Sequence, residues 1–197
     1  MPGPVAVLDA NVLYPIGSRD FFMWVHVEGV FQPKWTAQIH DEWIRNVSKN
    51  EGIPRAELEC CRALMDQNAS DALVRGWQRF LPKLAATGID PKDHHVVAAA
   101  LKAQADAGPN GQVIIVTSNV RHFPMRDLQT LGLSRIQPDA FAFALFRHDA
   151  DRVLAALAKM RAALKHPPFS RDRFVDELLA SRFPTLAKAV SPFKSRL

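Results

Sequence analysis

The sequence predicts an α/β fold with a central, mostly parallel sheet, followed by a small helical C-terminal segment. Two short apolar runs, at residues 5–8 and 113–117, have the composition of strands that are buried on both faces. Helical patterns separate these runs, and the order strand, helix, helix pair, helix, strand favours right-handed crossovers between parallel strands. Beyond Pro138 only helical patterns follow. We therefore expect an α/β domain over residues 1–138 and a basic helical extension over residues 139–197.

Composition limits the class of protein. A chain of 197 residues, 48% of them hydrophobic, can bury a core of its own. No apolar stretch approaches the roughly 18 residues that a membrane-spanning helix needs, and the N-terminus lacks the pattern of a signal peptide. Cys60 and Cys61 are adjacent, which suits neither an ordinary disulfide nor a structural zinc site. We therefore expect a cytoplasmic protein with no membrane partner.

The positive charge is unevenly distributed. Residues 1–138 hold 14 Lys and Arg against 14 Asp and Glu, whereas residues 139–197 hold 11 against 6, so the net charge of +5 lies in the last third. A basic segment suits a polyanionic substrate or an acidic partner. The alternative is that these residues only keep the helices soluble.

The first strand delivers Asp9 to its C-terminal end, where parallel sheets build their sites. Asn11 follows two residues later. Carboxylate and amide oxygens suit a hard divalent cation. The alternative is that Asp9 only orders the next turn or caps a helix.

The next elements are a helix capped by Ser18 and ending at Gly29, then a short strand within residues 30–35. Thr36 is expected to cap a helix that runs to about Asn50. The apolar stripe of that helix is Ile39, Trp43 and Val47. Glu42 lies at the edge of the stripe, where it can face a cleft or pair with Arg45.

Residues 54–86 are expected to form a helical hairpin whose second helix is capped by Ser70 or Asp71. A further helix is expected to begin at Asp93 and to end at Gly108–Gly111. Asp93 alone has a plain explanation, because an N-terminal cap contributes about 1 kcal/mol without any chemistry.

The strand at 113–117 ends in Thr117, Ser118 and Asn119, whose donors suit a phosphate group. The alternative is that they are turn-forming polar residues. Arg135–Gln137 is expected to form a last edge strand.

Beyond Pro138 we expect a small helical bundle. Asp139 is expected to cap a helix through Phe146, Asp149 a longer one and Ser170 a third, with a last turn or two near residues 185–190. The third helix is expected to bury Phe174, Val175, Leu178 and Leu179.

Asp9, Glu42 and Asp93 thus occur at a strand end, a helix edge and a helix start. At these residues the sequence resembles the PIN-domain family of metal-dependent ribonucleases, and within it the longer VapC-type toxins of type II toxin–antitoxin systems. The resemblance covers roughly residues 5–138, and its four blocks are Val7–Leu13, Glu42, Asp93–Ala100 and Val116–Pro124.

The resemblance implies a PIN-like three-layer α/β/α fold and an endonuclease that cuts RNA with Mg²⁺ or Mn²⁺. The metal ligands implied are Asp9, Glu42 and Asp93, and the catalytic set adds Asn119. The residues expected to contact substrate are Asn11, Thr117, Ser118, Arg121 and His122.

The sequence departs from the family pattern in its last block. Asn119 and His122 occupy the region where a fourth acidic residue is expected. We therefore expect one firmly held metal, a second recruited by RNA phosphates, and reduced activity. His94 and His95 point about 100° apart on a helix, so both cannot face one ion, which disfavours a catalytic zinc site.

The partners implied are RNA (tRNA, rRNA or mRNA), a small antitoxin protein and a second copy of the chain. Aromatic residues within 21–24 and 141–146 also suggested a dimer, although they can equally form core. The first alternative function is a degenerate PIN module that binds RNA or a protein without cleavage. A phosphatase with Asp9 as nucleophile is weaker, because Asn11 stands where a second acid is usual.

Overall fold

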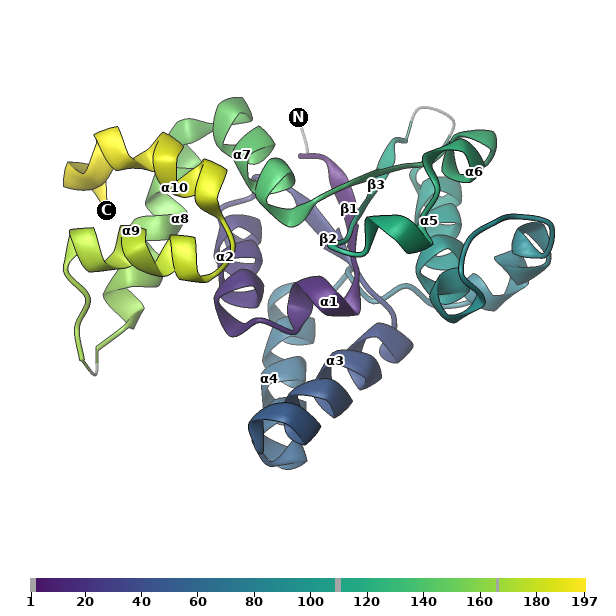
Figure 1. Cartoon of the computed structure of the whole chain (residues 1–197), viewed down its shortest axis with the longest axis horizontal. Coiled ribbons are helices and arrows are strands. Elements are labelled where there is room, and N and C mark those ends of the chain that lie inside the picture. The colour runs from purple at the N-terminus through teal and green to yellow at the C-terminus, as the bar shows by residue number, and fades with distance from the viewer. Residues whose placement is uncertain (1–2, 109–110, 166) are drawn as a thin grey trace.

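The computed structural model describes residues 3–108, 111–165 and 167–197. Its centre is a four-stranded sheet in the order β2-β1-β3-β4, with every neighbouring pair parallel. The strands are β1 (Val5–Leu8), β2 (Gln32–Lys34), β3 (Val113–Val116) and β4 (Ser134–Ile136). The predicted α/β fold with a parallel central sheet is confirmed (Figure 1).

The helices lie on both sides of this sheet, with α5 on one side and α2 on the other (Figure 1). The helices up to β4 are α1 (Ala10–Leu13), α2 (Ile16–Val27), α3 (Ala37–Glu51), α4 (Arg55–Asn68), α5 (His94–Ala107) and α6 (Met125–Thr130). Short 3₁₀ helices are η1 (Trp77–Leu84), η2 (Pro91–Asp93) and η3 (Val120–His122). The last part contains α7 (Pro138–His148), α8 (Ala150–Ala163), α9 (Arg171–Ala180), α10 (Pro184–Val190) and η4 (Ser191–Arg196).

The register of the central strands sets where the site forms. Leu8 pairs with Val116, so β1 and β3 end side by side. The amide of Asp9 donates to the carbonyl oxygen of Val116 at 3.1 Å, and the amide of Thr117 donates to that of Ile136 at 3.1 Å. Because the strands are parallel, the residues that follow them gather at one edge of the sheet.

Helix α3 forms as its sequence predicts. The hydroxyl oxygen of Thr36 accepts a hydrogen bond from the amide of Ile39 at 3.1 Å, which satisfies a free amide of the first turn. The stripe residues are buried, and Gly52 ends the helix with a φ of 70°. Glu42 therefore has a fixed place on the edge of the buried stripe.

Of the two helices predicted over residues 54–86, only the first is an α-helix in the structure. This helix is α4, but neither Ser70 nor Asp71 caps a second α-helix. The amide of Trp35 donates to Ala72 at 3.0 Å, and the amide of Val74 donates to Trp35 at 2.8 Å, so the chain here is extended beside β2. This pairing excludes a helix at that point.

One of the next two helix boundaries differs from prediction, and the other agrees with it. Helix α2 begins at Ile16, so Ser18 lies buried in its first turn instead of capping it. Helix α5 ends at Ala107, and of the predicted stop at Gly108–Gly111, residues 109–110 lie outside the described residues.

In the last part, Asp149 and Ser170 cap α8 and α9 as predicted, but Asp139 does not cap α7. Its carboxylate instead accepts hydrogen bonds from the amides of Thr185 (3.1 and 3.0 Å) and Leu186 (3.1 Å), which lie in the first turn of α10. Leu179 was also wrongly predicted as buried, since 49% of its surface is exposed.

The buried residues of both parts form one continuous core. Phe183, before α10, packs its ring 4.9 Å from Phe21 and 5.8 Å from Phe22, and Phe22 stacks on Phe141 of α7 at 5.9 Å. These aromatic residues are therefore core, which removes them as a reason to expect a dimer. The domain division at residue 138 stays a prediction.

None of the helices in the described ranges is long and apolar enough to cross a membrane.

Replacing Asp139 with alanine should lower the free energy of unfolding by about 1–2 kcal/mol, because the first amides of α10 lose their acceptor. Denaturant unfolding measures this change. Asp172→Ala is the control, since Asp172 pairs with Lys194 at the exposed surface. Equal stability of the two variants would contradict the capping role.

Candidate active site

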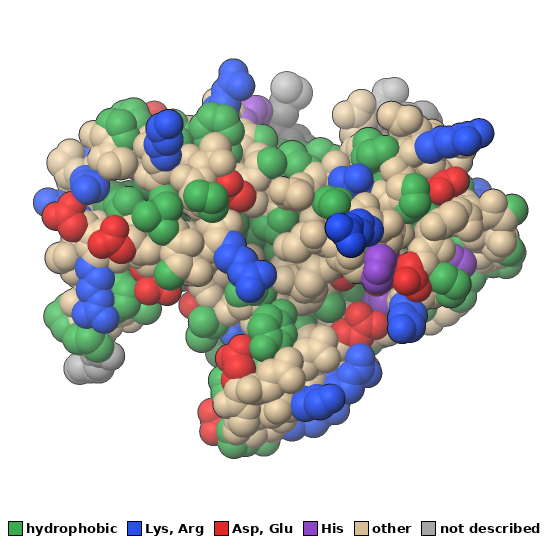
Figure 2. Space-filling view, viewed as in Figure 1, with side chains coloured by type: hydrophobic (Ala, Val, Ile, Leu, Met, Phe, Trp, Pro, Cys, Tyr) green, Lys and Arg blue, Asp and Glu red, His purple; other side chains and the backbone are tan. Residues whose placement is uncertain are grey.

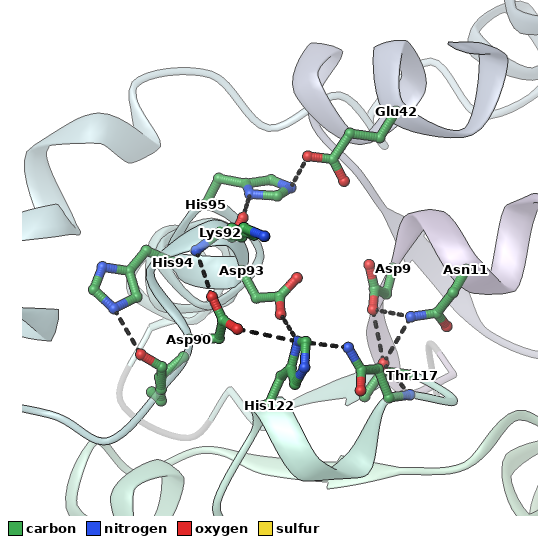
Figure 3. Close-up of polar contacts among 12 residues, drawn as sticks. Asp9, Asn11, Glu42, Asp90, Lys92, Asp93, His94, His95, Thr117 and His122 are labelled. Carbon is green, nitrogen blue, oxygen red and sulfur yellow. Dashed lines mark hydrogen bonds and ion pairs between the residues drawn. The ribbon is translucent and has the colours of Figure 1, made fainter. Parts of the chain in front are cut away.

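A cavity of about 560 Å³ opens at the C-terminal edge of the sheet. Its lining includes Asp9, which follows β1, Glu42 from α3, and Asp93, which ends η2. Asn11 from α1 and Ser118 after β3 line it too. The structure thus brings the three predicted carboxylates to one cavity, from elements far apart in the sequence (Figure 3).

Asp9 is buried and held by two neighbouring side chains. The Thr117 hydroxyl donates to Asp9 Oδ2 at 2.7 Å, and Asn11 Nδ2 donates to the same oxygen. Asn11 Nδ2 also lies 3.1 Å from Thr117 Oγ1, and its Oδ1 accepts from the Ser118 amide at 2.9 Å. Thr117 is fully buried, so its hydroxyl orients Asp9. The hydroxyl is therefore not open to a phosphate, in contrast to the prediction from the sequence. Asn11 has the same orienting role.

Burial raises the pKa of Asp9 to about 6. The hydrogen bond from Thr117 favours the charged form and opposes this rise, while the negative charge of Asp93 adds to it. In the absence of a cation, Asp9 is therefore an acid whose ionisation disfavours the folded state.

Asp93 contacts the residues of the last block. His122 Nδ1 lies 2.7 Å from Asp93 Oδ2 and 2.7 Å from Asn119 Nδ2. One ring nitrogen carries either a proton or a lone pair, so it makes one of these two bonds at a time. The bond to the carboxylate requires the proton on Nδ1. His122 is thus directed at Asp93 (Figure 3), and Asn119 contacts His122.

Asp90 is a site residue that the sequence reasoning missed. Within the described residues, the group of three potential ligands whose atoms lie within 4.8 Å of one another is Asp90, Asp93 and His122. Asp9 and Glu42 are not in this compact group, so the predicted trio shares a cavity without being gathered on one point. The signal for Asp90 was its spacing: it lies one helical turn before Asp93, where it also caps η2.

His95 is a second residue that was not predicted. Its Nδ1 bonds to the carbonyl oxygen of Lys92 at 2.9 Å, and its Nε2 lies 3.6 Å from Glu42 Oε1. His94 turns away to the carbonyl oxygen of Ile89 at 3.1 Å, as the argument from helix geometry requires. The signal for His95 was a polar residue at the start of an otherwise apolar helical run.

Burial lowers the pKa of His95 and raises that of Glu42, with the charge of Asp93 contributing to the latter. A neutral His95 that donates through Nδ1 leaves a lone pair on Nε2. That buried nitrogen has no hydrogen-bond partner and faces a carboxylate oxygen. Two acceptors this close need a proton or a cation between them.

The two remaining residues predicted to contact substrate, Ser118 and Arg121, line different cavities. Ser118 is exposed and lines the cavity, where its hydroxyl is open to a ligand. Arg121 is exposed and lines a different cavity, of about 430 Å³, together with Asp90 and His122. Arg121 therefore does not line the main cavity.

These residues fit a hard divalent cation. Their donors are mainly carboxylate oxygens, and Asp9 is buried near a second negative charge, that of Asp93. The arrangement can hold a cation and an anionic ligand at the open side of the cavity.

Comparisons with known proteins agree with this reading. The family described as VapC50 C-terminal domain matches residues 138–192. A protein of Mycobacterium tuberculosis (strain ATCC 25618 / H37Rv), named "Putative ribonuclease VapC50", is 29% identical over 116 residues. That match covers 56% of this chain and 64% of the relative's length. A search of the solved structures found no significant match.

The parallel sheet and the acidic cavity at its C-terminal edge define an α/β protein of the PIN type. Within that class, the two sequence matches support a VapC-type PIN toxin family.

Replacing Asp9 with asparagine should stabilise the metal-free protein above pH 6. The native pKa of about 6 exceeds the ordinary 3.8, so the penalty is absent below pH 4, grows between pH 4 and 6, and is complete above. The gain in free energy of unfolding at pH 8 is up to about 3 kcal/mol. Denaturant unfolding in EDTA at pH 4.5 and pH 8 measures it, with Asp106→Asn as control. A gain independent of pH would contradict the burial of a charged Asp9.

Proposed function

We propose that the protein is a divalent-metal-dependent endoribonuclease and the toxin of a type II toxin–antitoxin pair. The observation that carries this proposal is the meeting of Asp9, Glu42 and Asp93 in one cavity at the C-terminal edge of the sheet. The similarity to a protein named as a ribonuclease supports the reaction class.

In this proposal Asp9, Glu42 and Asp93 hold Mg²⁺ or Mn²⁺. A bound divalent ion supplies Lewis acidity, which polarises a phosphate oxygen and lowers the pKa of water. Thr117 and Asn11 fix the orientation of Asp9, and the exposed Ser118 contacts the phosphodiester at the cavity mouth.

In this proposal Asp90 compensates for the fourth acidic residue that the last block, Val116–Pro124, lacks. His122 lies 2.7 Å from Asp93 and 3.5 Å from Asp90, so the site gains a carboxylate from another part of the chain. We infer that Asp90, Asp93 and His122 form the place for a second ion. Asn119 acts by orienting His122.

The proposed substrate is single-stranded RNA from tRNA, rRNA or mRNA, and the proposed regulator is a small antitoxin protein that covers the cavity. A homodimer and a cytoplasmic location belong to the same proposal. They rest on the family alone.

A second candidate function is RNA binding without cleavage. It is favoured by the compact group Asp90, Asp93 and His122, which leaves Asp9 and Glu42 outside it. It predicts retention of labelled RNA with no fragments under any metal.

Purified protein should cut single-stranded RNA with Mg²⁺ or Mn²⁺ and not with EDTA. Asp93→Asn should reduce kcat by at least about 100-fold. The reason is that Asp93 belongs both to the predicted trio with Asp9 and Glu42 and to the compact group with Asp90 and His122. The control is Asp106→Asn, which changes an exposed carboxylate paired with Lys102 at the other end of α5. Equal activity of Asp93→Asn and the parent protein would overturn the proposal, and intact bound RNA would favour the second function.

His122→Asp should tighten binding of Mn²⁺ about tenfold, because a third carboxylate joins Asp90 and Asp93. Isothermal titration with Mn²⁺ measures the change in the full-length protein. His148→Asp, at the end of α7, is the matched control. Unchanged affinity in the first variant would show that no ion binds beside His122.

A further inference from the structure

The cavity that contains the acidic site continues into a second cavity of about 280 Å³. The two share lining residues from both parts of the chain: Asn11, Pro15, Ser118, Ser181 and Arg182. They form one groove, which runs from the acidic site past α1 to the start of α7. The turn between α9 and α10 is therefore a wall of the groove.

Arg182 is the one Lys or Arg among the described residues that line these two cavities. Both cavities also contain acidic residues: Asp139 lines the smaller one, and the larger one is lined by Asp9, Glu42, Glu51, Asp93 and Glu177. A polyanion that enters this groove meets repulsion except where a cation lies, and Arg182 is that cation at the junction of the two cavities.

The other cations of the basic segment are largely engaged elsewhere. Ion pairs, carbonyl oxygens or an aromatic ring within the chain hold Arg152, Lys159, Arg161, Arg171, Arg173, Lys194 and Arg196. On the face shown in Figure 2, Lys and Arg side chains are scattered among acidic ones and form no continuous basic patch within the described residues. On this face the basic segment therefore offers no continuous surface for RNA, which directs attention to the one arginine that lines the groove.

The backbone of Arg182 is strained. Its φ is 67°, and among the described residues it is the one non-glycine residue with positive φ. Its amide donates to Leu179 at 3.0 Å and that of Phe183 donates to Leu178 at 2.9 Å, the pattern of a helix end that normally has glycine at this position. An arginine here costs stability, which is typical of a residue kept for function.

Anchors on both sides hold this turn in place. Phe183 is fully buried against Phe21, and the Asp139 carboxylate binds the first amides of α10. On the other side, a Cβ on Gly17 would lie 2.0 Å from Ser181 Oγ, so α2 approaches the turn as closely as glycine allows. The backbone of Arg182 is therefore held at a fixed point on the wall of the groove, from which its exposed side chain extends.

We propose that Arg182 binds a backbone phosphate of single-stranded RNA next to the bond that is cut. The proposal rests on the proposed function and deepens it, since the C-terminal segment then supplies a substrate contact to the site. Arg suits this role because its planar group donates two parallel hydrogen bonds to a phosphate.

Arg182→Gly tests the proposal because glycine relieves the strained φ while removing the charge. Binding of a fluorescein-labelled single-stranded oligoribonucleotide is measured by anisotropy in EDTA, in the Asp93→Asn background, over a range of salt. We expect Kd to rise about five- to tenfold, and the slope of log K against log salt to fall by about 0.7, the value for one phosphate contact. The melting temperature should stay equal or rise.

Two further variants serve as controls. Arg182→Lys keeps the charge and should keep the salt slope, with an intermediate Kd. Lys188→Gln removes one exposed charge from α10, outside the groove, and should leave both quantities unchanged.

Unchanged Kd and slope in Arg182→Gly would overturn the proposal, as would weaker binding accompanied by a lower melting temperature, which would show a structural role. Cleavage by the parent protein is scored separately. Its absence would refute the nuclease function while the binding data still decide the role of Arg182.

Discussion

The structure depends on the parallel pairing of β1 with β3, which ends both strands at the same edge. That pairing carries Asp9 into a buried position, where its amide bonds to Val116 and its carboxylate meets the Thr117 hydroxyl. An ionised carboxylate is stable there only if polar groups and positive charge surround it. The surrounding elements contribute to this environment, since α1, α3 and α5 each bring a polar residue to that edge.

Charge balance links folding to ligand binding at this edge. Burial and the neighbouring Asp93 make an ionised Asp9 unfavourable in the metal-free protein, and a cation would relieve that cost. A similar imbalance occurs between Glu42 and His95, where a carboxylate oxygen faces a ring nitrogen that has no hydrogen-bond partner. A site built in this way gives up some stability in the free protein in return for affinity towards a cation.

The C-terminal helices are part of the same unit of packing. Phe183 and Phe141 lie in one aromatic cluster with residues of α2, so the last third of the chain cannot move freely against the sheet. Its contribution to the site is a fixed wall, at which Ser181 and Arg182 extend the acidic cavity into a groove. The groove is therefore built from both parts of the chain.

The sequence by itself determined the elements whose signals are local. The strand before Asp9 and the helix capped by Thr36 follow from apolar periodicity and from a cap three residues away. Tertiary structure alone decided the long-range partners: Asp139 caps a helix 46 residues later, and residues 72–74 pair with Trp35 instead of forming a helix. It also brought Asp90 beside His122. Local spacing cannot specify such pairings, because each depends on where the folded chain returns and on which polar groups remain to be satisfied there.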